Sequence, residues 1–250
     1  MPRRASERLV TFTPRGPLRR SPNDHLWEGH DERPDPSRPV NHAAALETAS
    51  WLTETFFTMN RPMAARIQPA DLIEVLNRAK VRFVLIGAHG IAGWLHQPRS
   101  TRDVYVVVGM RDYKKAVRAI ESAYPALVVD EQAAVTRFRD PDDQQVAIDV
   151  LRPYDLYATA FKNSVPVAKT HRVPNLELAL AGKFAAMVSR HREREKRLLD
   201  LADFVGIVKQ NYPRIHRDRL QTLGELVYAG GGAHLLECVD DAQANRDLRL

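Results

Sequence analysis

The chain has 250 residues, enough for one sizeable domain or for a core domain with an appendage. It has no apolar run long enough to span a bilayer and no signal-peptide pattern, so we expect a cytoplasmic protein without a membrane partner. The single cysteine, Cys238, excludes an internal disulfide framework and a cysteine-rich zinc site. A formal net charge of +6 is compatible with a polyanionic partner but does not by itself indicate one.

The first 58 residues differ from the rest in composition. They hold 8 Arg against 8 Asp and Glu, together with 7 of the 16 prolines, so the remaining residues carry the whole positive charge. Such sequence buries too little apolar surface to offset the cost of ordering the chain. We therefore expect a mostly disordered extension over 1–58, with one short helix over 42–57. The alternative is that the natural protein starts at Met59 or Met63.

The first well-defined elements lie between residues 69 and 124. Segment 69–80 predicts an amphipathic helix with proline in its first turn, and segment 81–87 predicts a buried strand that ends at Gly87. Segment 111–124 repeats apolar residues at helical spacing, which predicts a second helix.

Strands and then helices are expected after this point. Short strands are predicted at 126–130, 134–140 and 145–153, and the turn "PDDQ" between the last two predicts a hairpin. Beyond about residue 154 the pattern is helical, centred on 175–209, with a late break at the glycines of 230–232. This order predicts an α+β protein: a core over 59–160 with a mixed sheet flanked by helices, and a helical C-terminal domain over 161–250.

The glycine turn after the first strand allows two interpretations. Gly87, Gly90 and Gly93 follow a strand at G-x-x-G-x-x-G spacing, which is compatible with an NAD(P)-binding Rossmann-type protein. However, Pro98 comes only a few residues into the following helix, whereas that fold needs a long crossover helix before a parallel strand. The dinucleotide reading is kept as an alternative.

A second interpretation uses more of the sequence. The segments "FVLIGAHG", "IAGWLH", "PRST" and "RDVYVVV" follow one another, and the last of them carries Asp103 and Tyr105. Asp149 lies in the later strand "VAIDVL" and Lys183 in the helix "ELALAGKFAAM". This ordered set resembles the nucleotidyltransferase superfamily with its polymerase-β-like fold, in particular the small bacterial branch that includes abortive-infection toxin-like proteins.

The resemblance covers about residues 69–205 and implies a function. It implies Mg²⁺-dependent transfer of a nucleoside monophosphate from a triphosphate such as ATP to a hydroxyl of RNA, protein or a small molecule. It also implies one or two magnesium ions held by Asp103 and Asp149, and a possible antitoxin-like partner protein. The residues expected to bind the nucleotide are Gly87, Ala88, Arg99, Thr101 and Lys183.

Tyr105 departs from this pattern, because it stands where the family carries a second carboxylate. A phenol with a pKa near 10 is neutral at physiological pH, so the site lacks one negative charge and one metal ligand. Two outcomes stay open. One magnesium ion held by Asp103, Asp149 and the nucleotide's phosphates supports weakened transfer, or the chain is a catalytically degenerate module that binds a nucleotide or RNA.

Each candidate residue also has a structural alternative. Asp103 is also explained as a cap at the start of its strand, Arg99 as the partner of a nearby acid, and Lys183 as a solvated lysine. Asp149 interrupts an apolar strand and needs a partner, because an unpaired buried carboxylate is costly. The run "RHREREKR" at 190–197 is most simply a solvated helix face, although its positive charge is compatible with RNA backbone contact.

Overall fold

The computed structural model describes residues 40–60 and 67–250. The disorder expected for residues 1–39 and the alternative start at Met63 lie outside these residues. None of the helices in the described part combines the length and apolarity needed to cross a bilayer.

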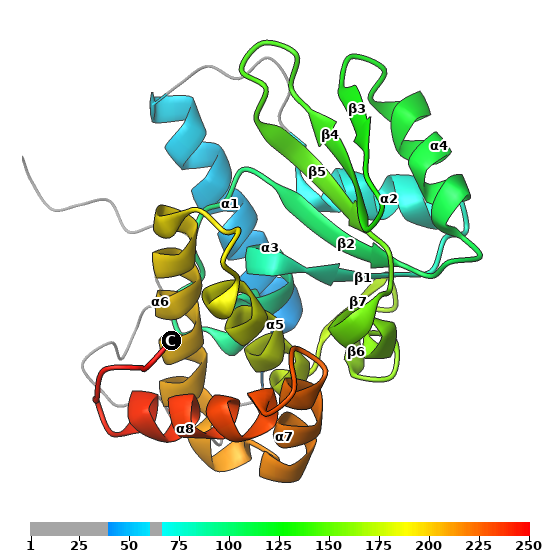
Figure 1. The fold of residues 1–250 in the computed structure, drawn as a ribbon. Coiled ribbons are helices and arrows are strands. Elements are labelled where there is room, and N and C mark those ends of the chain that lie inside the picture. The colour runs from blue at the N-terminus through cyan, green and yellow to red at the C-terminus, as the bar shows by residue number, and fades with distance from the viewer. Residues whose placement is uncertain (1–39, 61–66) are drawn as a thin grey trace, which may run out of the picture. The chain divides into compact units, whose positions relative to one another are not determined.

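A five-stranded mixed sheet forms the centre of the fold (Figure 1). Its strands lie in the order β1-β2-β5-β4-β3, and β2 and β5 are the parallel pair while the other neighbours are antiparallel. The predicted hairpin is formed by β4 and β5. The strands are β1 (Phe83–Ile86), β2 (Val104–Val108), β3 (Val128–Glu131), β4 (Val135–Arg139) and β5 (Val146–Leu151). The α+β class predicted from the sequence is confirmed.

Helices cover both faces of this sheet. On one face the side chains of Val104 and Val106 pack with α2 (Pro69–Arg78) and α4 (Tyr113–Ala123). On the other face Val107 packs with the C-terminal helices. These helices are α5 (Leu176–Val188), α6 (Arg194–Asn211), α7 (Arg217–Glu225) and α8 (Gly231–Gln243), with the 3-10 turn η4 (Tyr212–Arg214) after α6. Two-sided burial explains why β1 and β2 are continuous apolar runs rather than alternating ones.

The glycine turn leads into a very short helix. The chain passes from β1 into α3 (Gly87–Ile91) and η2 (Ala92–Trp94), and then through an extended loop into β2. β1 and β2 are antiparallel neighbours. The dinucleotide-binding alternative requires a long crossover helix and a parallel strand at this point, so the structure contradicts it.

A second small sheet follows β5, where only helices were expected. After η3 (Asp155–Thr159), strands β6 (Ser164–Val167) and β7 (His171–Pro174) form an antiparallel hairpin, and β7 contacts β1. The turn of this hairpin places Ala168 and Lys169 at positive φ without a glycine or asparagine. Because the usual turn residues are missing, the sequence pattern did not reveal this hairpin.

The helix expected within the N-terminal extension exists and packs against the core. It is α1 (His42–Asn60), in which Ala49 is fully buried. The Thr53 hydroxyl accepts a hydrogen bond of 3.1 Å from the Thr101 amide, in the loop before β2. A boundary at residue 58 falls inside this helix, which ends at Asn60, and the position of the domain boundary stays a prediction.

Candidate functional site

One row of side chains crosses the sheet on the face covered by α5 and α6. Tyr105 on β2 lies beside Asp149 on β5, and Asp149 lies beside Arg137 on β4. Side chains alternate across a strand, so Asp103 shares this face with Tyr105. The structure thus brings together the two expected carboxylates with the phenol beside them.

The Asp103 carboxylate is held by the loop that precedes it. The Thr101 hydroxyl donates to Asp103 Oδ1 at 2.5 Å, and the Thr101 amide is fixed by Thr53 of α1. This connection explains the position of Thr101: it orients Asp103 and ties that residue to the N-terminal helix.

Tyr105 is a neutral hydrogen-bond donor in this site. Burial raises the pKa of its phenol, and the negative charges of Asp103 and Asp149 and a hydrogen bond to Asp103 raise it further. Both carboxyl groups share this face of the sheet with the phenol, and both raise its pKa. The phenol is therefore neutral at physiological pH and adds no negative charge to the site.

Asp149 is the most buried member of this row, with 5% of the residue exposed. Burial raises the pKa of its carboxyl group to about 6, while Arg137 opposes the shift and Asp103 adds to it. Arg137 Nε lies 3.5 Å from Asp149 Oδ1, and that oxygen has no hydrogen-bond partner in the described part of the chain. The charged partner of Asp149 is thus Arg137, at the long end of ion-pair distances.

Gly87 makes room for the Tyr105 ring. It has a φ of 67°, and a Cβ atom placed on it would lie 2.9 Å from Tyr105 Cδ2. Only glycine tolerates both the left-handed backbone and this approach. The glycine turn and the unusual tyrosine are therefore matched to each other.

A buried ionic cluster forms the opposite wall. Lys183 Nζ lies 2.8 Å from Asp200 Oδ1 and 2.6 Å from Asp203 Oδ2. Arg99 makes a bidentate pair with Asp203, with N···O distances of 2.9 Å for both Nε and Nη2, and Arg192 pairs with Asp200. Burial alone raises the pKa of Asp203, but Lys183 and Arg99 outweigh it and hold that pKa below its usual value.

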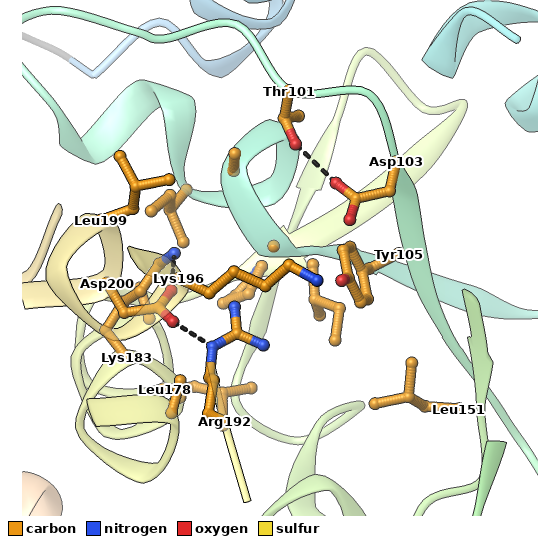
Figure 2. A pocket seen from close by; sticks show the side chains of 18 of the residues that line it. Thr101, Asp103, Tyr105, Leu151, Leu178, Lys183, Arg192, Lys196, Leu199 and Asp200 are labelled. Atoms are coloured by element: carbon orange, nitrogen blue, oxygen red, sulfur yellow. Dashed lines mark hydrogen bonds and ion pairs between the residues drawn. The ribbon is translucent and has the colours of Figure 1, made fainter. Parts of the chain in front are cut away.

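The two sides enclose a cavity of about 280 Å³. Figure 2 shows Asp103 and Tyr105 on one side and Arg192, Lys196 and Asp200 across from them. The expected site residues that line the cavity are Gly87, Ala88, Arg99, Thr101, Asp103, Tyr105 and Lys183. Asp149 is the expected residue that does not line it.

Four charged residues of this site were not predicted from the sequence. Asp200 and Asp203 are three positions apart on α6, which places them on one helix face, but acids at that spacing are common in exposed helices. Arg192 and Lys196 line the cavity although they belong to the run that was expected to be a solvated face. Arg192 lies just before α6 and Lys196 lies in its first turn, so their position depends on how α6 packs against α5, and no local pattern reveals it.

The residues present do not fit the two-ion magnesium site that the resemblance implies. Magnesium requires near-octahedral oxygen ligands. In this site Asp103 accepts from Thr101, a neutral phenol follows two positions later at Tyr105, and Asp149 is outside the cavity lining. Within residues 40–60 and 67–250, no group of three or more His, Cys, Asp or Glu is placed to hold a metal ion.

Comparison with known proteins gives only distant structural similarity. No protein-family model matches the chain, and no curated protein matches it by sequence. An antigenic nucleotidyltransferase-like protein from Paracoccidioides brasiliensis superposes with a TM-score of 0.41 and 15% identity, covering 77% of this chain and 94% of that one. Terminal uridylyl transferase 4 from Trypanosoma brucei with bound GTP gives a TM-score of 0.28 and 12% identity, covering 67% of this chain and 58% of that one.

Both TM-scores are low, so neither similarity assigns an activity to this chain. The class of protein is defined by the structure itself: an α+β chain whose five-stranded mixed sheet carries a charged cleft against a helical C-terminal part. This arrangement is consistent with a nucleotidyltransferase-like fold.

Proposed function

We propose that the cleft binds a nucleoside triphosphate and that the chain is a catalytically degenerate member of the nucleotidyltransferase-like fold. The observation that carries this proposal is the charge of the helix-side wall. Two carboxylates, Asp200 and Asp203, stand among four cations that line the cavity: Arg99, Lys183, Arg192 and Lys196. The wall therefore has two positive charges in excess, facing a glycine turn whose backbone N–H groups favour phosphate oxygens.

The remainder of the lining favours a ligand that also has an apolar part. Ile91, Pro174, Leu178, Leu199 and Tyr157 contribute to the cavity beside the charged groups. Small-molecule sites commonly combine an apolar pocket with a few polar groups that fix orientation. A nucleotide offers both parts, with its base against the apolar side chains and its phosphates toward the cations.

Transfer of a nucleoside monophosphate is the second candidate. The resemblance implies it, and Asp103 lines the cavity as that reaction requires. The available metal ligands argue against transfer. The neutral Tyr105 hydroxyl stands where the family has a charged ligand, and Asp149 is buried. The proposal for the chain as it stands is therefore binding, with transfer to RNA, protein or a small molecule as the activity that was weakened or lost.

The test is nucleotide binding by the full-length protein. ATP, GTP, CTP and UTP are titrated by calorimetry, both with magnesium and with EDTA, and we expect at least one of them to bind. Arg192→Gln should weaken that binding, whereas Arg217→Gln, on the distant α7, should not. Absence of binding by every triphosphate in both buffers contradicts the proposal.

A transfer assay separates the two candidates. The protein and its Tyr105→Asp variant are incubated with each labelled triphosphate and magnesium, and product formation is followed. We expect little or no transfer by the unaltered chain, and a gain in the variant if the rest of the cleft is intact. Strong transfer by the unaltered chain contradicts the degenerate assignment.

A further inference from the structure

The sheet side of the cleft has two carboxylates, and each of them already has a polar neighbour. Asp103 is bound by the Thr101 hydroxyl at 2.5 Å, and Arg137 lies 3.5 Å from Asp149. Tyr105 lies two positions from Asp103 and beside Asp149 on the same face of the sheet, and it lines the cavity. A divalent cation here meets a neutral phenol instead of a third carboxylate and competes with Arg137 for Asp149, which leaves less negative charge to attract it.

The helix side offers cations that differ in their freedom to meet a ligand. The Lys183 side chain is 8% exposed, and its ammonium group lies between Asp200 and Asp203. Arg99 is fixed by its bidentate pair with Asp203. By contrast, the side chains of Arg192 and Lys196 are 31% and 51% exposed and line the cavity.

Arg192 can turn toward a ligand without leaving a buried charge unpaired. Its present partner, Asp200, also accepts from Lys183 at 2.8 Å. When Arg192 moves to a phosphate oxygen, Asp200 keeps Lys183, so the main penalty for breaking a buried pair is avoided. Among the residues that the structure describes, the ion-pair partner of Lys196 is Glu193, an exposed neighbour three residues away, at 3.1 Å, and exposed pairs of this kind are weak.

From this arrangement we infer that the cleft binds its polyphosphate ligand in the metal-free form, with Arg192 and Lys196 supplying the positive charge that magnesium supplies in a two-ion site. The inference rests on the proposed function, since it names the form in which the nucleotide binds. It follows from two facts together: the sheet side is occupied by Tyr105, and the helix side has cations in excess that are free to rearrange.

The test compares ATP binding by the full-length protein in EDTA and in excess magnesium, by calorimetry. We expect binding in EDTA, and an apparent affinity that is several-fold weaker with magnesium, because the ion neutralises part of the phosphate charge that the two side chains bind. Arg192→Gln and Lys196→Gln should each weaken binding in EDTA by roughly 10- to 100-fold, the loss expected for a hydrogen bond to a charged group. Lys209→Gln is the control, since Lys209 lies at the far end of α6 and contacts Asn245.

Two variants test whether Tyr105 is the reason why ATP binds without magnesium. Tyr105→Asp restores a charged ligand, and its ATP binding should become stronger with magnesium than with EDTA. Tyr105→Phe keeps the ring without adding a charge and should still bind ATP in EDTA. Binding of ATP by the unaltered protein only when magnesium is present overturns this inference while leaving the proposed function intact. Absence of binding in both buffers refutes the proposed function instead.

Discussion

Asp203 is the carboxylate on which the helix-side wall depends. It neutralises Lys183 at 2.6 Å and receives a bidentate pair from Arg99, and its side chain is 5% exposed. The change Asp203→Asn removes one negative charge with little change of shape. It leaves Arg99 without a charged partner and Lys183 with Asp200 alone.

The expected loss of stability is large. Removing one member of a buried ion pair costs about 3–5 kcal/mol, because the remaining charge stays buried without compensation. A domain has only about 5–15 kcal/mol of net stability. With a change of about 2–4 °C per kcal/mol for a chain of this size, the midpoint of thermal unfolding should fall by about 6–20 °C.

The pH dependence of the free energy of unfolding is a second test of the role of Asp203. The folded-state pKa of Asp203 lies below the ordinary value of 3.8. Its contribution to stability is therefore fully present above the unfolded pKa and is lost as the pH falls through the folded pKa. Urea unfolding of protein and variant should differ most at neutral pH, and the two free energies should converge below about pH 4.

The matched control is Asp240→Asn. Asp240 also makes a bidentate pair with an arginine, Arg217, but its side chain is 40% exposed, so the loss should be at most about 1 kcal/mol. If Asp203→Asn costs no more than Asp240→Asn at pH 7, the buried cluster does not stabilise the cleft and the reasoning is refuted.

Three further perturbations follow from the same structure. The pKa of Asp149 is about 6 in the folded state, against 3.8 in the unfolded state, so the unfolded state loses this proton at lower pH. The free energy of unfolding should therefore fall by about 3 kcal/mol between pH 4 and 6. Asp149→Asn should remove this fall, as measured by urea unfolding. Gly87→Ala forces an alanine to positive φ against a ring and should cost about 1–3 kcal/mol in thermal unfolding, whereas Gly109→Ala, with 3.7 Å to its nearest neighbour, should stay within about 1 kcal/mol. Thr53→Val removes the hydroxyl that accepts a hydrogen bond from the Thr101 amide. The loss should lower the free energy of unfolding in urea by about 1–3 kcal/mol.

Much of the fold was accessible from local patterns. The helix at 69–80, the strand ending at Gly87 and the hairpin across "PDDQ" are each specified by periodicity and turn chemistry within a few residues. The β6–β7 hairpin was not, because its turn uses Ala168 and Lys169 at positive φ. The packing of α1 was not accessible either, because composition describes the average of a segment and this helix packs through a few small residues such as Ala49.

The sheet side of the site was also accessible, because spacing along a strand fixes which side chains share a face. Asp103 and Tyr105 are two positions apart, and an apolar strand with one acid predicts that Asp149 faces a polar site. The helix side of the site could not be predicted from the sequence. Whether Lys183 meets a phosphate or a carboxylate depends on the register between α5 and α6, which brings Asp200 and Asp203 to its ammonium group.

The charges on the sheet side and on the helix side of the cleft are complementary. A two-ion site needs carboxylates on the sheet and tolerates few excess cations nearby, because the ions already supply positive charge. Here the sheet carries Tyr105 two positions after Asp103, and Gly87 accommodates its ring. The helix wall has two more cations than carboxylates. Its most exposed cations, Arg192 and Lys196, line the cavity in which the ions of a two-ion site would act. Under the proposed function, a cleft with these charges favours an anionic ligand, and Tyr105 contributes by adding no charge to the sheet side.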